Sequence, residues 1–165
     1  TDLIAGLPTD TPESFKNSLD SIVRLNAECI TVHTLCMKRA SRLTTEGVTL
    51  DLQQARDARE MLAYTQNILG QNEYIPYYMY RQSRMVGNLE NVGWSKKGFE
   101  SLYNVYVMDE THTILACGSG GVTKLKRNNP DYLERIFNFK YPYEYIDRFD
   151  ELIQRKSGIM QFYGQ

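Results

Sequence analysis

The sequence predicts an α/β fold built on a parallel sheet. Apolar and β-branched runs predict strands at residues 2–7, 29–35 and 74–80. Two segments with apolar residues at helical spacing, residues 12–26 and 51–70, separate these strands. Strand, helix, strand, helix, strand at this spacing is typical of βαβ units, in which right-handed crossovers join parallel strands.

The first helix is expected to begin at Pro12 and to end near Asn26. Thr11 provides an N-cap hydroxyl, and Glu13 places an acid in the first turn. One apolar stripe then follows at helical spacing: Phe15, Leu19, Ile22 and Val23. This stripe predicts a helix that covers one face of the sheet.

The second helix is expected after a polar loop at residues 38–48. Thr49 or Asp51 is its candidate N-cap, and Gly70 is its expected end. Its apolar face is predicted to consist of Leu52, Ala55, Ala58, Met61, Leu62, Thr65, Ile68 and Leu69.

The pattern changes after Tyr80, and we expect two parts within one compact unit: residues 1–80 and an appended extension at residues 81–165. The extension is predicted to hold an extended loop at 88–98, a hairpin of strands 102–108 and 113–117, a glycine-rich turn at 118–122, a short helix from Asn129 and a final helix from Pro142. Tyr145, Phe149, Leu152 and Ile159 mark the expected buried face of the final helix.

Composition excludes several classes of protein. The 165 residues are 42% hydrophobic and 24% charged, with a net charge of −1, so no basic surface for nucleic acid or an anionic membrane is indicated. No apolar run reaches the roughly 20 residues that a membrane span needs. The three cysteines, Cys29, Cys36 and Cys117, form no short pair, which favours a reducing, cytoplasmic location.

Tyrosine is unusually frequent, with 12 residues, several of them in the segment 74–80. Tyr combines a flat apolar ring with a polar tip, which suits a pocket for a large planar ligand. The same pattern also fits the half-exposed face of a sheet.

Polar residues at the ends of the predicted strands are candidate ligand contacts. Asp2 lies on an apolar strand before a Gly-Leu-Pro turn, where α/β proteins bind ligands, although a solvated acid is the alternative. His33 fits a core or pocket-rim residue or a general acid–base, and Cys36 fits a ligand contact or a small buried side chain. Arg81 and Gln82 could hold a carboxylate or lie in a solvated loop.

The run Gly118-Ser119-Gly120-Gly121 offers a backbone cradle for a phosphate or carboxylate, or simply a tight turn. It lacks the helix and the acid that complete a dinucleotide fingerprint. His33 and His112 have no further ligands at metal-binding spacing, so no metal site is predicted within the chain.

Three segments together resemble the oxygen-independent coproporphyrinogen III oxidases, radical S-adenosylmethionine enzymes of the coproporphyrinogen dehydrogenase family, and in particular their HemZ-like subgroup. The segments are DLIAGLP with TPESF at residues 2–15, PYYMYRQ with MVGNLENVG at residues 76–93, and LACGSGG at residues 115–121. The resemblance extends from residue 1 to about residue 160.

The resemblance implies the C-terminal part of a partial (β/α)6 barrel. It also implies a 4Fe–4S cluster on a Cys-x-x-x-Cys-x-x-Cys loop, which reduces S-adenosylmethionine to a 5′-deoxyadenosyl radical. That radical starts the decarboxylation of coproporphyrinogen III propionates to vinyl groups in haem biosynthesis. The resemblance implies no particular electron donor.

Carried over residue by residue, the resemblance implies S-adenosylmethionine contacts at Asp2, Cys36, Gly118, Gly120 and Gly121. Arg81 and Gln82 fall in a segment typical of the subgroup and are candidate substrate contacts. The cluster-binding cysteines are absent from this sequence. We therefore expect that the chain alone binds neither cluster nor cofactor and is inactive.

Two other functions stay open, a haem chaperone of the same family and an independent small α/β ligand-binding domain. The abrupt start of the chain in a strand indicates a missing N-terminal half. An unpaired edge at this first strand predicts self-association.

Overall fold

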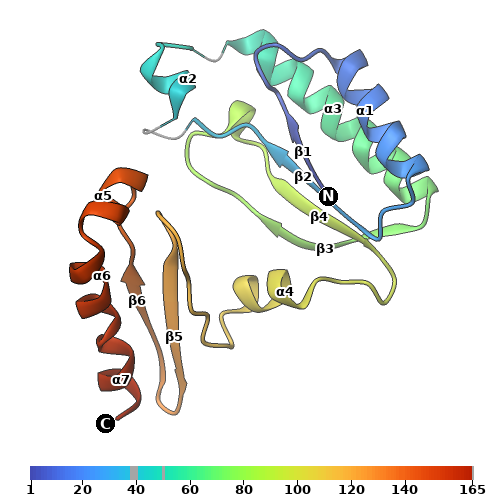
Figure 1. Cartoon of the computed structure of the whole chain (residues 1–165). Coiled ribbons are helices and arrows are strands. Elements are labelled where there is room, and N and C mark those ends of the chain that lie inside the picture. Colours follow the sequence, from blue (N-terminus) through green and yellow to red (C-terminus); the bar gives the residue numbers. More distant parts are fainter. Residues whose placement is uncertain (38–40, 50, 165) are drawn as a thin grey trace. The chain divides into compact units, whose positions relative to one another are not determined.

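The computed structural model describes residues 1–37, 41–49 and 51–164. The chain divides into two compact units, Thr1–Ser101 and Leu102–Gln165 (Figure 1). The boundary predicted from the sequence lies between residues 80 and 81 and separates two parts of one compact unit. The observed division falls later because an additional strand at Asn91–Lys96 joins the first sheet.

The sheet of the first unit has four strands in the order β1-β2-β4-β3. β1 and β2 pair in parallel, and β4 runs antiparallel to both β2 and β3, so β1, β2 and β3 all run in the same direction. The mixed α/β class is confirmed, and the three strands predicted from the sequence share one direction, but the sheet is not purely parallel because β4 lies antiparallel between β2 and β3. The bounds are β1 Asp2–Ala5, β2 Cys29–Thr34, β3 Tyr74–Tyr80 and β4 Asn91–Lys96.

Strand β4 corrects the extended loop that was expected at residues 88–98. Its apolar residues Val92 and Trp94 alternate with Asn91, Gly93 and Ser95, which are buried. This composition is typical of a loop. The strand forms because its two neighbours supply the backbone partners.

Helices α1 (Pro12–Arg24) and α3 (Leu52–Gln71) begin as the sequence predicts. Thr11 caps α1, and Asp51, not Thr49, caps α3 through a reciprocal pair of hydrogen bonds with Gln54. Two details were wrong: Leu52 is 79% exposed, and α3 continues past Gly70 to Gln71.

Two short helical segments complete the first unit, α2 (Arg42–Thr45) and the 3-10 helix η1 (Val86–Asn88). Helix α2 lies within the expected loop at 38–48, of which residues 38–40 are outside the described residues. Its N-cap is Ser41, whose hydroxyl accepts a hydrogen bond from Thr44 N.

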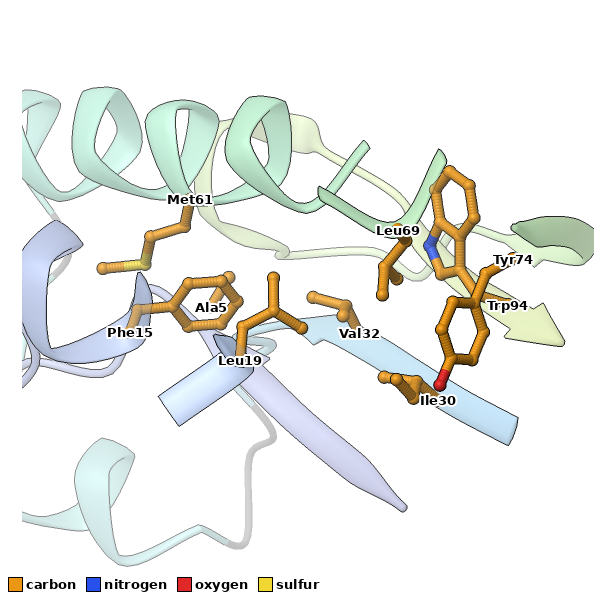
Figure 2. Close-up of a cluster of buried hydrophobic side chains, with 9 residues drawn as sticks. All are labelled: Ala5, Phe15, Leu19, Ile30, Val32, Met61, Leu69, Tyr74 and Trp94. Carbon is orange, nitrogen blue, oxygen red and sulfur yellow. The ribbon is translucent and has the colours of Figure 1, made fainter. Parts of the chain in front are cut away.

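One hydrophobic core joins α1 and α3 to the sheet (Figure 2). Phe15 and Leu19 of α1 and Met61 of α3 are essentially inaccessible to solvent. Burial of each such side chain contributes about 1.5–3 kcal/mol. The cluster consists of Ala5, Phe15, Leu19, Ile30, Val32, Met61, Leu69, Tyr74 and Trp94.

The second unit contains one helix, a hairpin and three short helices, which run beside the hairpin (Figure 1). Its elements are α4 Leu102–Asp109, β5 Val122–Asn128, β6 Asp131–Phe137, α5 Pro142–Asp147, α6 Phe149–Lys156 and α7 Gly158–Tyr163. The buried residues include Leu125, Phe139, Leu152 and Phe162.

Three expectations for this unit are wrong. The segment 102–108 is helix α4 and not a strand, and from 113–117 only Ile114 forms a bridge, with Lys124. Asn129 and Pro130 do not start a helix; they form the turn between β5 and β6. The final helix is divided into α5, α6 and α7, and Phe149 is exposed.

Candidate functional site

The two faces of the first sheet differ in chemistry because side chains alternate along each strand. On β1, Leu3 and Ala5 pack into the core, while Asp2 and Ile4 point to the opposite face. We call the core side, covered by α1 and α3, the apolar face. The polar face is defined by Asp2, Ile4, Thr31, His33, Tyr78, Tyr80 and Asn91.

A row of three polar side chains crosses the polar face. His33 Nε2 lies 3.8 Å from Asp2 Oδ1, and His33 Nδ1 lies 3.4 Å from the Tyr80 hydroxyl. The Tyr80 ring meets the imidazole edge-on. These residues come from β1, β2 and β3, so Tyr80 reaches over the intervening β4. The row can present a carboxylate and an imidazole to one ligand.

A second row depends on a glycine. The Tyr78 hydroxyl lies 3.0 Å from Thr31 Oγ1, and the ring crosses β4 at Gly93. A Cβ atom at Gly93 would lie 1.9 Å from Tyr78 Cε1, so only glycine leaves room for the ring. Tyr78 and Tyr80 are stacked, with ring centroids 6.3 Å apart. The two rows therefore form one aromatic surface.

Burial raises the pKa of both Tyr78 and Tyr80 above the ordinary value of 10.0. A phenol is already neutral near pH 7, and burial extends the neutral form, which can donate and accept hydrogen bonds, to higher pH.

A hollow of ≈ 280 Å³ lies beside this surface, where β2 ends. Parallel strands of α/β proteins bind ligands at this end. Cys36 lies just past β2, and its Sγ donates a hydrogen bond to Ser83 O at 3.2 Å. The lining consists of Ile4, His33, Thr34, Leu35, Cys36, Tyr80, Gln82 and Asn91.

The structure brings some of the predicted site residues together. Cys36 and Gln82 line the same hollow, and Asp2 touches His33, which lines it as well. Arg81 does not join them: its Nη2 lies 2.6 Å from Glu90 Oε1, and it lines a different cavity.

The glycine run lies in the second unit as a tight turn. Gly118 and Gly120 have φ values of +86° and +72°, which favour glycine. Asn138 Nδ2 donates to Gly118 O at 2.8 Å, and Gly120 N donates to Phe139 O at 2.7 Å. A Cβ atom at Gly121 would lie 3.0 Å from Cys117 O. These contacts explain the glycines by backbone geometry, and their ligand role stays a prediction.

The described residues do not fit a 4Fe–4S cluster. They contain no group of three or more His, Cys, Asp or Glu side chains able to hold a metal ion. Cys29 and Cys36 lie at opposite ends of β2, and Cys117 lies in the second unit. Within the same described part of the chain, no helix is long and apolar enough to cross a membrane.

From the sequence, His33, Tyr78 and Tyr80 were considered as separate residues, and their association with Asp2 and Thr31 was not predicted. The alternation of side chains along a strand could have indicated part of this arrangement, because it places Thr31 on the same face as His33, and Tyr78 on the same face as Tyr80. What the sequence did not reveal is that both pairs share a face, because β4 between them was read as a loop.

No protein-family model matches the chain. The oxygen-independent coproporphyrinogen-III oxidase-like protein HemZ of Bacillus subtilis is 36% identical over 160 residues, which covers 97% of this chain and 32% of that protein. The chain thus spans about a third of the length of this curated relative.

A solved structure of coproporphyrinogen III oxidase (HemN) from Escherichia coli, described as a radical SAM enzyme, shares the fold with a TM-score of 0.54. The match covers 91% of this chain and 33% of that one, at 17% identity. The resemblance inferred from the sequence motifs is confirmed: the chain is similar to part of a HemZ-like coproporphyrinogen oxidase.

Proposed function

We propose that the chain is the C-terminal part of an oxygen-independent coproporphyrinogen III oxidase and that its polar face forms one wall of the active site. The complete enzyme would convert propionates of coproporphyrinogen III to vinyl groups in haem biosynthesis, through a 5′-deoxyadenosyl radical. The 36% identity to HemZ over nearly the whole chain carries this proposal.

The polar face suits such a wall in its chemistry. Asp2 can accept hydrogen bonds from a ribose hydroxyl or an ammonium group of S-adenosylmethionine, and His33 beside it can hold the carboxylate in place. The stacked Tyr78 and Tyr80 offer flat apolar surface for a tetrapyrrole. We propose a second cofactor contact at the backbone of Cys36.

For the substrate we favour Gln82 over Arg81 as a propionate contact. The Arg81 guanidinium already pairs with Glu90, whereas Gln82 is exposed beside the hollow. Gly118, Gly120 and Gly121 remain proposed cofactor contacts, which their turn would present through backbone groups.

S-adenosylmethionine and the cluster would supply the radical chemistry in the complete protein. Because the described residues offer no cluster site, we propose that the 165-residue chain alone is inactive. Iron content and visible absorbance of the chain after anaerobic reconstitution check this; an assembled cluster would contradict it. We also propose that the complete protein forms a partial barrel and is cytoplasmic. The chain alone is proposed to self-associate through the edge strand β1.

The test is anaerobic turnover of coproporphyrinogen III by the complete, reconstituted protein, followed by carbon dioxide release. Asp2→Asn should lower the rate at least tenfold, if the carboxylate contributes a charged hydrogen bond of about 1.5–3 kcal/mol to the ligand. Glu13→Gln is the matched control, since Glu13 is an exposed acid on α1. Haem binding without turnover would instead support the haem chaperone. A protein that shows neither turnover nor haem binding would contradict the proposal.

A further inference from the structure

A second cavity, of ≈ 330 Å³, lies on the apolar face between α3 and the sheet. Its floor is apolar and comprises Val32 of β2, Val92 and Trp94 of β4 and Leu62 of α3. The volume lies at the lower end of the range of small-molecule sites, about 300–1,000 Å³. It is large enough for a compact organic ligand.

The cavity exists because the buried stripe of α3 is narrow. Ala58 and Met61 face the core, and Thr65 is buried but also lines the cavity. Ala63 and Gln66 are exposed and line the cavity as well. Ala63 has only a methyl group there, so the space over β4 is left unfilled. The indole of Trp94, 8% exposed, offers a flat wall.

The rim carries an excess of positive charge. Arg59 of α3 and Arg81 after β3 both line the cavity, together with one acid, Glu90. Glu90 is engaged by Arg81 at 2.6 Å. Among the described residues, no carboxylate lies within 4.0 Å of the Arg59 guanidinium. One guanidinium is therefore available to a carboxylate, which it can bind through two parallel N–H donors.

We propose that this cavity binds a small monocarboxylate with an aromatic or compact apolar body. The carboxylate would bind Arg59 at the rim, and the body would lie against Trp94 and Leu62. The side-chain amides of Gln66 and Asn88 can hydrogen-bond the remaining carboxylate lone pairs. This inference is independent of the proposed function, which concerns the opposite face of the sheet.

Trp94 is the single tryptophan of the chain, so its fluorescence reports on the cavity. The probe is 4-iodobenzoate, which quenches an indole on contact. The titration uses the complete protein, and its Trp94→Phe variant isolates the Trp94 signal by difference. We expect saturable quenching by 4-iodobenzoate and at least tenfold weaker saturation by the neutral 4-iodobenzyl alcohol.

Two variants and a control locate the site. Arg59→Gln should weaken binding of 4-iodobenzoate at least tenfold, and Ala63→Leu should abolish it by filling the cavity without changing its charge. Arg56→Gln should bind like the unaltered protein, since Arg56 is an exposed arginine of α3 outside the cavity lining.

Quenching that does not saturate, equal quenching by the alcohol, or undiminished binding by Arg59→Gln would overturn the proposal. So would an absence of any Trp94 quenching, the result expected if another segment of the complete protein fills the cavity. Because the readout is binding, a protein without oxidase activity still decides the question.

Discussion

The apolar and polar faces of the first sheet come from the same strands but are held in different ways. On the apolar face, Phe15, Leu19 and Met61 fill a solvent-free core. On the polar face, the tyrosines are fixed by hydrogen bonds to Thr31 and His33 and by stacking. Burial of apolar area dominates stability, while exchange of water for protein hydrogen bonds contributes little.

The comparison teaches that stability and ligand chemistry can be changed separately in this chain. A substitution in the buried core of the apolar face should act on unfolding, and one at Asp2 should act on the affinity for a ligand of the polar face. The following predictions break or sharpen that separation, from the largest effect to the smallest.

Leu19→Ala should lower the free energy of unfolding by about 2–5 kcal/mol, because it leaves a cavity in the core of the apolar face. The measurement is urea denaturation followed by circular dichroism. Ile4→Ala is the control on the polar face, where Ile4 is 41% exposed, and should cost less than about 1 kcal/mol. Equal losses for the two variants would remove the distinction between the faces.

Gly93→Ala should destabilise the chain by about 1–3 kcal/mol, because the new methyl group overlaps the Tyr78 ring. In the Gly93→Ala background, Tyr78→Ala should cost less than it does alone. A double-mutant cycle by urea denaturation measures this coupling. Additive effects would show that the ring does not depend on the glycine.

Tyr78→Phe should lower the free energy of unfolding by about 0.5–1.5 kcal/mol, because it removes only the hydrogen bond with Thr31 Oγ1. Tyr103→Phe, at a 66% exposed position in α4, is the matched control and should have no measurable effect. If Tyr78→Phe behaves like this control, the Thr31 contact contributes nothing to stability.

Alkaline pH should give the smallest and most gradual effect. Burial raises the pKa of Tyr78 and Tyr80, so the folded state keeps these protons while the unfolded chain releases them. This contribution to stability is present below the ordinary value of 10.0 and is lost as the pH rises through the raised pKa values.

The double variant Tyr78→Phe/Tyr80→Phe should therefore show a shallower loss of stability above about pH 10 than the unaltered chain. Part of the slope should remain, since the pKa values of Tyr64 and Tyr74 are raised as well. Thermal unfolding across this pH range is the measurement, and an unchanged slope would contradict the assignment.

The helices that cover the apolar face could be predicted from local signals. Thr11 with Pro12 and Asp51 with Gln54 are cap patterns that act within one turn, so they appear in the sequence. Leu52 fitted the apolar spacing of α3 but is exposed in the first turn of that helix. Periodicity alone does not indicate where the packing partner ends.

The polar face could be predicted only in part, because it depends on pairing between distant segments. Cys36 was found by its place just past the end of β2, whereas Asp2 was found as an acid on an apolar strand and in fact begins β1, away from the end where the hollow lies. The row of Asp2, His33 and Tyr80 was not, since it requires β4 to lie between β2 and β3. Likewise, the segment of α4 is rich in Val and Tyr and resembles a strand, yet it forms a helix, and no strand among the described residues pairs with it.

The most direct test of the separation between the faces is calorimetric titration of the complete, reconstituted protein with S-adenosylmethionine, together with thermal unfolding. Asp2→Asn should raise Kd at least tenfold and leave the unfolding midpoint unchanged. Leu19→Ala, measured where it is fully folded, should lower the midpoint and leave Kd unchanged. Unaltered affinity in Asp2→Asn, or equal loss of affinity in both variants, would contradict the assignment of the polar face as the ligand wall.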